Sequence, residues 1–299
     1  MEKEILENYI KAGKIAARVR EESRSRAKVG AKLFDLAEWI ENRIKELGAD
    51  IGFPVNISVN NIAAHFTPSK DDETTFKQGD VIKIDIGTHV NGYIGDTATT
   101  VSLGGNEDLL KASREALNEA IKIAKPGTKL GEMGTVIEQT IKKYGFKPIS
   151  NLTGHGLDKY DLHAEPQIPN ITNDMEYELK EGQAIAIEPF ATTGSGRVNE
   201  SGDVMIFMLV GPRPVRNFDA RRIISFAQKR NGLPFAKRWV LSGLGMSDIR
   251  FRLALRELST KNILHEYHVL KDVDDCKISQ FEHTVIVGDK PIVTTRYEE

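Results

Sequence analysis

Two stretches of this sequence repeat one pattern, and in each an apolar segment leads to an acidic residue. FKQGDVIKIDIG spans residues 76–87 and LKEGQAIAIEPF spans residues 179–190. Each has a lysine, a glycine two residues later, and then an apolar segment that predicts a strand. The first strand leads to Asp85 and the second to Glu188. Because an unpaired charge is costly to bury, an acid at this place needs a partner, and both residues are candidates for a functional site.

A third acid, Asp96, follows Asp85 in a predicted β-hairpin. The sequence between them contains Asn91-Gly92, a strong hairpin signal. If the turn centres on Val90-Asn91 the two aspartates lie directly opposite, and if it centres on Asn91-Gly92 they lie on a diagonal. Either register keeps them on one sheet face, with side chains roughly 5–8 Å apart. Two like charges at this spacing need a cation between them, unless both side chains point to solvent.

Two further residues could complete a metal site. TGHGL places His155 between glycines, where the backbone can approach a ligand closely, and QFEHTVIV places Glu282 among apolar residues. Four carboxylates and one imidazole suit two first-row divalent ions and argue against a thiolate zinc site. Paired metals of this kind activate a water molecule and polarise a carbonyl group.

A duplication accounts for the elements that must position these residues. Residues 27–48 align with residues 124–145 at a constant offset of 97, and the two strand segments align at an offset of 103. Two matches in the same order indicate a repeated helix–helix–strand unit. Apolar spacing predicts its helices at residues 2–27, 33–47, 106–124 and 130–144, and the first strand at residues 81–86.

The repeat predicts an α+β fold with a mainly antiparallel sheet and a pseudo-twofold axis. Residues 207–268 match nothing in the first half and read as basic helices, so we expect them to form an inserted helical subdomain. Residues 1–206 and 269–299 would form the main domain.

Composition bounds the class of protein. The net charge of −2 favours neither a nucleic-acid binder nor a membrane-surface protein, and the single cysteine, Cys276, allows no intramolecular disulfide. No apolar run reaches the roughly 20 residues of a membrane span. We therefore expect a soluble cytoplasmic protein.

The ordered motifs resemble a known family over essentially the whole chain. They are NNIAAHFTP, IDIGTHVNGYIGDTATT, GHGLDKYDLHAEPQIPN, IAIEPFATTGSG and QFEHTVIV. Together they are similar to the methionine aminopeptidases of the second type, which have the pita-bread fold and carry a helical insertion. The chain resembles the archaeal form more than the eukaryotic one.

The resemblance implies a role for each matching residue. Asp85 would chelate one ion, Asp96 and Glu282 would bridge two ions, and His155 and Glu188 would complete the second ion's ligands. His163 would hold the substrate backbone and steady the oxyanion, and His65 would contact the substrate or the departing methionine. Glu188 would also accept a proton from water. The methionine pocket would be lined by Phe53, Leu162 and Tyr267.

The implied reaction removes the N-terminal methionine from nascent polypeptides that have a small second residue. It would use two divalent ions, with Co, Mn, Fe and Zn all compatible with the ligands. We expect a monomer, with the ribosome as a candidate partner and no specific nucleic-acid binding.

Two other functions fit parts of the same sequence. Xaa-Pro dipeptidases and aminopeptidase P use the same five-ligand logic, but generally carry an extra N-terminal domain. Alternatively, a non-catalytic relative could bind RNA or the ribosome through the basic, aromatic stretch at residues 221–239. Such a module would be expected to lose ligands, whereas all five remain here, which favours the enzyme.

Overall fold

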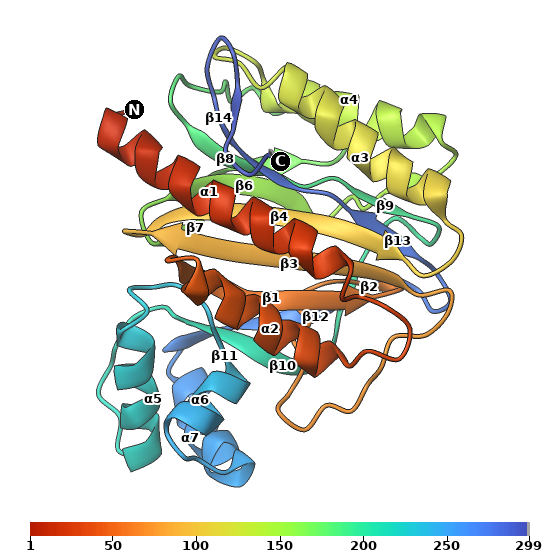
Figure 1. Cartoon of the computed structure of the whole chain (residues 1–299). Helices are drawn as coiled ribbons and strands as arrows, with labels where there is room; N and C mark the ends of the chain where they lie inside the picture. Colours follow the sequence, from red (N-terminus) through yellow and green to blue (C-terminus); the bar gives the residue numbers. More distant parts are fainter. Residues whose placement is uncertain (298–299) are drawn as a thin grey trace.

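The computed structural model describes residues 1–297 and has two helix-backed halves with a helical cluster attached to one side (Figure 1). The first half contains α1 (Lys3–Arg24), α2 (Leu33–Glu46), β1 (Asp50–Val59), β2 (Ile62–Ala64), β3 (Val81–Val90) and β4 (Tyr93–Ser102). Strands β1, β3 and β4 form an antiparallel sheet in the order β1-β3-β4. Helices α1 and α2 pack on this sheet and bury their apolar stripes against it.

The second half repeats this plan. It contains α3 (Glu107–Lys122), α4 (Leu130–Lys143), β5 (Lys147–Pro148), β6 (Thr153–Asp158), β7 (Asp161–Pro169), β8 (Ala184–Ile187) and β9 (Phe190–Thr192). After the inserted segment the chain returns as β13 (Ile278–Gln280), β14 (His283–Ile286) and β15 (Ile292–Val293). These strands form antiparallel sheets in the orders β15-β14-β8-β6-β7 and β13-β9-β5, against which α3 and α4 pack.

The predicted duplication is confirmed in the structure. Helix α4 begins and ends 97 residues after α2, and β8 begins 103 residues after β3. An isolated β-bridge joins Lys32 to Thr75, and its counterpart joins Lys129 to Glu178. Even the ion pairs of these lysines recur, with Glu73 and Glu176 respectively. The two halves therefore share backbone and side-chain detail, as a repeated unit requires.

The predicted helices agree with the observed ones to within a few residues. The first strand was expected at residues 81–86, but β3 continues to Val90. It does so because the hairpin ladder with β4 runs as far as the turn.

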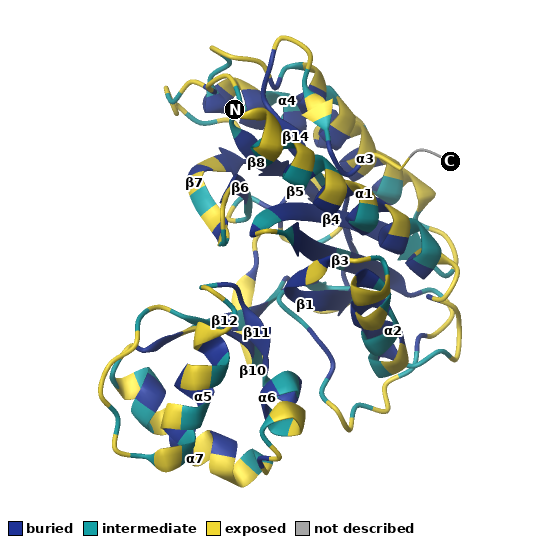
Figure 2. Cartoon of the chain, turned by 60° about the vertical axis from the view of Figure 1, so that its left-hand side comes forward, coloured by how far each residue is buried: buried dark blue, intermediate teal, exposed yellow. Residues whose placement is uncertain are grey.

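The inserted segment combines helices with strands. It contains β10 (Asn199–Leu209), α5 (Phe218–Gln228), β11 (Phe235–Ala236), α6 (Lys237–Gly243), α7 (Asp248–Thr260) and β12 (Leu264–Lys271). Its sheet has the order β11-β10-β12-β2, so a strand of the first half completes it. The helices enclose their own apolar cluster around Phe207 and Phe251, seen as buried inner faces in Figure 2. The predicted boundaries at residues 207 and 268 fall inside β10 and β12, and the division into domains stays a prediction.

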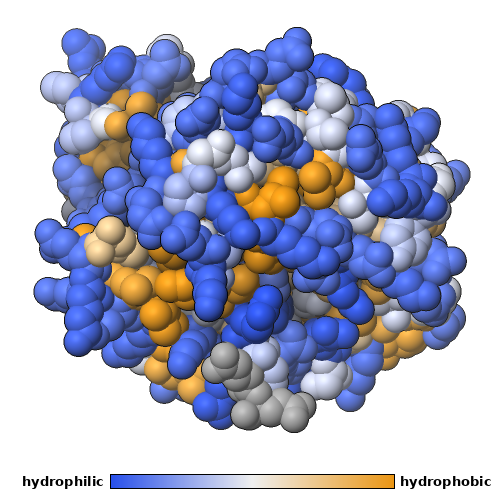
Figure 3. Space-filling view, turned by 90° about the horizontal axis from the view of Figure 1, so that it is seen from above, coloured by the Kyte–Doolittle hydropathy of each residue, from blue (hydrophilic) through white to orange (hydrophobic). Residues whose placement is uncertain are grey.

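The surface is largely hydrophilic. Figure 3 shows one face on which hydrophilic residues surround a few hydrophobic areas. Among residues 1–297, no helix has the length and apolar character needed to cross a bilayer.

Candidate metal centre

The β3–β4 hairpin places Asp85 and Asp96 on a diagonal. Val90 pairs with Tyr93, so the turn centres on Asn91-Gly92, and both of these residues adopt positive φ angles, 53° and 91°. Such angles define the type I′ turn that an Asn-Gly pair favours. Asp85 therefore faces Ala98, and Asp96 faces Gly87. Of the two registers that the sequence allowed, the structure adopts the diagonal one.

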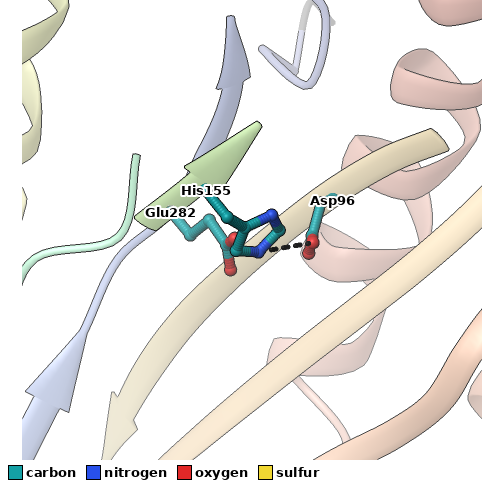
Figure 4. A group of neighbouring side chains, drawn as sticks. All are labelled: Asp96, His155 and Glu282. Atoms are coloured by element: carbon teal, nitrogen blue, oxygen red, sulfur yellow. Dashed lines mark ion pairs between the residues drawn. The ribbon is translucent and has the colours of Figure 1, made fainter. Parts of the chain in front are cut away.

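The other three candidate ligands come from the second half. His155 lies in β6, Glu188 directly follows β8, and Glu282 lies between β13 and β14. Figure 4 shows Asp96, His155 and Glu282 converging, with potential ligand atoms all within 4.8 Å of one another. His155 Nε2 lies 3.7 Å from Asp96 Oδ2 and 3.7 Å from Glu188 Oε1. The imidazole thus stands between carboxylates from both halves.

Burial sets the protonation of these groups. It raises the pKa of Asp85 to about 7, against a hydrogen bond from Gln280 that lowers it. Burial also raises the pKa values of Asp96, Glu188 and Glu282 well above their usual range, and the neighbouring carboxylates add to the rise. His155 has its pKa lowered by burial to about 4, so at neutral pH it is in the uncharged form that binds metals.

The hydrogen bonds in the site fit a bound cation. Asp96 is 2% exposed, which rules out the alternative in which both aspartates point to solvent. Asp85 Oδ1 and Asp96 Oδ1 are buried without a hydrogen-bond partner. Unpartnered carboxylate oxygens at this depth are costly unless a positive charge occupies the space between them. The donor set is hard and oxygen-rich with one nitrogen, which fits divalent first-row metals.

A cavity beside these ligands gathers all ten of the predicted site residues. Its lining also includes four residues that the sequence did not single out. The predicted members are Phe53, His65, Asp85, Asp96, His155, Leu162, His163, Glu188, Tyr267 and Glu282. Their shared location supports the assigned roles, and the individual roles stay predictions.

Hydrogen bonds orient the two histidines that are not candidate ligands. His65 Nδ1 lies 3.1 Å from the His268 carbonyl oxygen, and His163 Nδ1 lies 3.2 Å from the Tyr267 hydroxyl. Burial lowers the pKa of His65 to about 4. His163 opens onto the cleft, yet burial of its ring and the nearby histidines lower its pKa as well. Both rings are therefore neutral at pH 7, and each has its Nδ1 already engaged.

Sequence reasoning missed five residues of this site. Gln280 lies two residues before Glu282, and its side-chain amide donates to Glu188 Oε2 at 3.3 Å and to Glu282 Oε2 at 3.4 Å. The period of a strand could have identified it. The cavity lining that was missed consists of Asn56, Ala64, Ile206 and Pro234. Ile206 and Pro234 reach the site only through the tertiary fold, for which no local pattern gives a signal.

Comparison with known proteins places the chain among metallopeptidases. Residues 7–223 match metallopeptidase family M24. The methionine aminopeptidase of Thermococcus onnurineus is 51% identical over 284 residues, which cover 94% of this chain and 96% of that protein. The methionine aminopeptidase of Pyrococcus abyssi is 50% identical over 294 residues, covering 97% and 99%.

A solved structure agrees in fold. The crystal structure of methionine aminopeptidase from Thermotoga maritima superposes with a TM-score of 0.72 at 24% identity, covering 99% of this chain and 98% of that one. At this identity the likeness concerns the fold alone.

Proposed function

This chain belongs to metallopeptidase family M24, and we propose that it removes the N-terminal methionine from polypeptides. The observation that carries the proposal is the meeting of five candidate metal ligands from both halves in the lining of one cavity that also has an apolar wall. High identity to methionine aminopeptidases over nearly the full chain supports it and does not favour the two alternative functions.

The residues that would hold the metal are Asp85, Asp96, His155, Glu188 and Glu282. We propose two divalent ions, drawn from Mn, Fe, Co and Zn, because four carboxylates supply enough charge to balance two such ions. When bound, such ions polarise a carbonyl group and lower the pKa of water.

Glu188 is the proposed proton carrier. It directly follows β8. Its Oε2 accepts a hydrogen bond from the Gln280 side-chain amide, and its Oε1 lies close to the His155 ring. Burial raises its pKa well above the usual range, which makes the Glu188 carboxylate a stronger base than an exposed glutamate. We assign Glu188 to accept a proton from the attacking water and to give it to the leaving amine.

His163 and His65 are proposed to bind the substrate around the scissile bond. The Tyr267 hydroxyl has one hydrogen and two neighbouring acceptors, His163 Nδ1 at 3.2 Å and the weaker Met208 Sδ at 3.4 Å. We assign the hydrogen to His163 Nδ1, so that Nε2 carries the ring proton and can donate to the oxyanion that forms on the substrate. His65 stands across the cavity with its Nδ1 at the His268 carbonyl, and its Nε2 is left for the substrate or the departing methionine.

An apolar wall would select the methionine side chain. Phe53, Leu162 and Tyr267 line it, each at most 6% exposed. Phe53 lies across Gly87 so closely that a Cβ built there would be 2.2 Å from its ring. Glycine at this position therefore lets the ring lie across the strand. An unbranched thioether fits such a narrow apolar site.

A second cavity extends from the first and would receive the rest of the peptide. The two cavities share Ala64, His65, His155, His163 and Glu188. Beyond them the second is walled by polar and apolar side chains, namely Asn151, Leu152, Thr153, Gln167 and Phe190. We propose that the side chains shared by the two cavities limit the second residue of the substrate to a small one.

The substrates proposed for this chain are nascent polypeptides in the cytoplasm. The ribosome is proposed as a partner, and a monomer is proposed as the working state. A net charge of −2 for the whole chain favours a transient encounter over firm nucleic-acid binding.

The direct test is release of free methionine from Met-Ala-Ser and Met-Leu-Ser peptides. The protein would be stripped with chelator and refilled with Mn, Fe, Co or Zn in turn. We expect metal-dependent release from the alanine peptide and little from the leucine peptide. Cleavage of Ala-Pro peptides instead would support the Xaa-Pro alternative, and no release with any metal would overturn the enzyme proposal.

A further inference from the structure

The two proposed bridging ligands, Asp96 and Glu282, lie in or directly before strands of different sheets. Asp96 lies in β4, at the edge of the β1-β3-β4 sheet, and Glu282 immediately precedes β14 of the second-half sheet. The distance between their carboxylates therefore depends on how β4 and β14 are joined. We call this junction the seam and define it by Asp96, Thr97, Ala98, Glu282 and Thr284.

Hydroxyl groups make most of the hydrogen bonds across the seam. Thr97 Oγ1 donates to the Glu282 carbonyl oxygen at 2.8 Å. Thr284 Oγ1 accepts from the Asp96 amide and donates to the Asp96 carbonyl, both at 2.8 Å. One backbone bond, from the Glu282 amide to the Ala98 carbonyl at 3.2 Å, completes it. The seam is thus joined mainly by side-chain hydrogen bonds, whereas neighbouring strands of a sheet are joined by a continuous series of backbone hydrogen bonds.

Helix α1 packs against β4 beside the seam so closely that no side chain separates the two backbones. A Cβ built on Gly95 would lie 2.6 Å from the Gly13 amide nitrogen, and one built on Gly13 would lie 2.4 Å from the Thr294 carbonyl oxygen. Thr88 Oγ1 also donates to the Ala12 carbonyl at 2.8 Å. Because no side chain separates them here, the helix is fixed closely against β4.

This close approach brings one buried cation to the seam. Arg20 lies seven residues after Gly13, on the same helix face, and is 6% exposed. Its Nη1 donates to Thr97 Oγ1 at 2.5 Å and to the Thr295 carbonyl at 3.2 Å, and it lies 3.4 Å from His283 Nδ1. Its Nη2 pairs with Glu21 at 3.1 Å. One guanidinium therefore contacts β4, β14 and the segment after β15.

We propose that Arg20 is a positioning residue that acts through Thr97 to hold Asp96 and Glu282 at the spacing that binds metal. The inference rests on the proposed metal site. The Thr97 hydroxyl has a single hydrogen. Because Arg20 donates to Thr97 Oγ1, the hydroxyl acts there as an acceptor and its own hydrogen is directed to the Glu282 carbonyl. A planar guanidinium can serve several acceptors in fixed directions, which the point charge of a lysine does not reproduce.

The test compares Arg20→Met and Arg20→Lys with Arg18→Met, a control on the same helix whose exposed side chain pairs with Glu22. Calorimetric titration of the chelated proteins with Mn²⁺ alone measures metal affinity without any peptide. We expect Arg20→Met to weaken Mn²⁺ binding by about 10- to 100-fold, the usual cost of removing a group that orients metal ligands. Arg20→Lys should recover part of this loss, and Arg18→Met should match the unchanged protein.

Peptide kinetics add an independent readout. At a fixed Mn²⁺ concentration below saturation, kcat for Met-Ala-Ser should fall in Arg20→Met while KM stays within about twofold, because the peptide contacts are intact. If Arg20→Met lowers the melting temperature but leaves Mn²⁺ affinity unchanged, the residue is structural only and the proposal is wrong.

A second variant keeps the proposal testable if Arg20→Met fails to fold. Thr97→Val removes the hydroxyl through which Arg20 acts, and Thr97→Ser keeps it. We expect the valine variant to weaken Mn²⁺ binding and the serine variant to retain it. Where the double variant of Arg20→Met and Thr97→Val can be made, its loss should be smaller than the sum of the single losses. Normal Mn²⁺ affinity with no peptide cleavage in the unchanged protein would instead contradict the proposed function.

Discussion

The side-chain amide of Gln280 lies 3.3 Å from Glu188 Oε2, and the same nitrogen lies 3.4 Å from Glu282 Oε2. Gln280 is 1% exposed. An uncharged donor thus joins the candidate ligand that follows β8 to the candidate ligand that precedes β14. It offsets repulsion between these acids without competing with a metal for their charge.

Two substitutions of Gln280 separate the loss of its hydrogen bonds from the effect of an added charge. Gln280→Met removes the donor, and Gln280→Glu adds a fifth acid to the cluster. In chelated protein at pH 8 we expect the methionine variant to lose about 1–3 kcal/mol of unfolding free energy, the range for a buried acceptor left without its hydrogen-bond partner. The glutamate variant should lose more, because like charges repel at this distance. Urea denaturation measures both, and equal losses would contradict the electrostatic explanation.

Substitution of the proposed proton carrier or of the proposed metal ligands should reduce or abolish peptide cleavage. Glu188→Gln should lower kcat for Met-Ala-Ser by at least about 10²-fold, because it removes a proton acceptor. Asp85→Asn and His155→Ala should abolish turnover by removing metal ligands. Glu132→Gln on the exposed face of α4 provides a matched control and should be fully active. Full activity in any of the three site variants would contradict the mechanism.

The pH dependence of stability should reveal the buried acids. The buried histidines and Lys83, whose pKa burial lowers to about 7, bind more protons in the unfolded chain than in the folded one, so their contribution to stability rises with pH. The buried acids act in the opposite direction. In the folded chain burial raises the pKa of Asp85 to about 7 and those of the other three acids well above their usual range. Through these acids the folded state holds protons that the unfolded chain has lost, so their contribution to stability falls as pH rises.

Thermal unfolding of chelated and Mn²⁺-loaded protein between pH 6.5 and 8 checks this sign. Lys83 and the histidines outside the metal centre are common to both forms, so the difference between the two melting temperatures reports on the acids. In the loaded protein the acids have no protons to lose, because metal binding requires their deprotonated form. The melting-temperature gain on adding Mn²⁺ should therefore increase with pH, and a gain that decreases would show that the acids are already ionised.

Tyr267 is predicted to control the tautomer of His163. Its hydroxyl lies 3.2 Å from His163 Nδ1, and without it neither ring nitrogen is fixed as the donor. Tyr267→Phe should lower kcat for Met-Ala-Ser by about tenfold with a smaller change in KM, because it weakens an interaction made in the transition state. Nitrogen NMR of His163 should show a mixture of tautomers in the variant. A single tautomer identical to the original would contradict this role.

A buried ion pair fastens the inserted segment to the first half. Arg238 on α6 pairs with Glu41 on α2, whose Oε2 also accepts from Trp239 Nε1 at 2.8 Å. Arg238→Met would leave Glu41 buried without its cation, at a cost of about 3–5 kcal/mol. Adding Glu41→Leu should restore part of that loss. The exposed pair of Arg252 and Asp248 is the control, and Arg252→Met should cost under about 1 kcal/mol by urea denaturation.

Much of the architecture could be predicted because local signals and the fold agree. Apolar spacing located α2 and α4, and the repeat of Lys32 and Lys129 anticipated two matching units. The four candidate acids were noticed because they lie in or beside strands that should be apolar. Beyond their shared place in one cavity, their role as ligands stays a prediction. These features depend on residues close in sequence.

What could not be predicted depends on distant contacts. The hairpin register needed the turn at Asn91-Gly92 to be chosen over its neighbour, and both turns satisfy the same alternation of side chains. Strand β2 joins the sheet of the inserted segment through β12, far along the chain. Arg20 looks like one more basic residue of an amphipathic helix until Thr97 and Thr295 are placed beside it.

The contacts of Arg20 also bear on how the protein folds during synthesis. They link residue 20 to residues 97, 283 and 295, so nearly the whole chain lies between the groups that one guanidinium joins. Contacts of such long sequence separation form late, because the loops that they close are costly in entropy. Until residue 295 has left the ribosome, α1 has no Thr295 to contact and the seam is open. The proposed metal centre should therefore take up metal only after residue 295 has emerged.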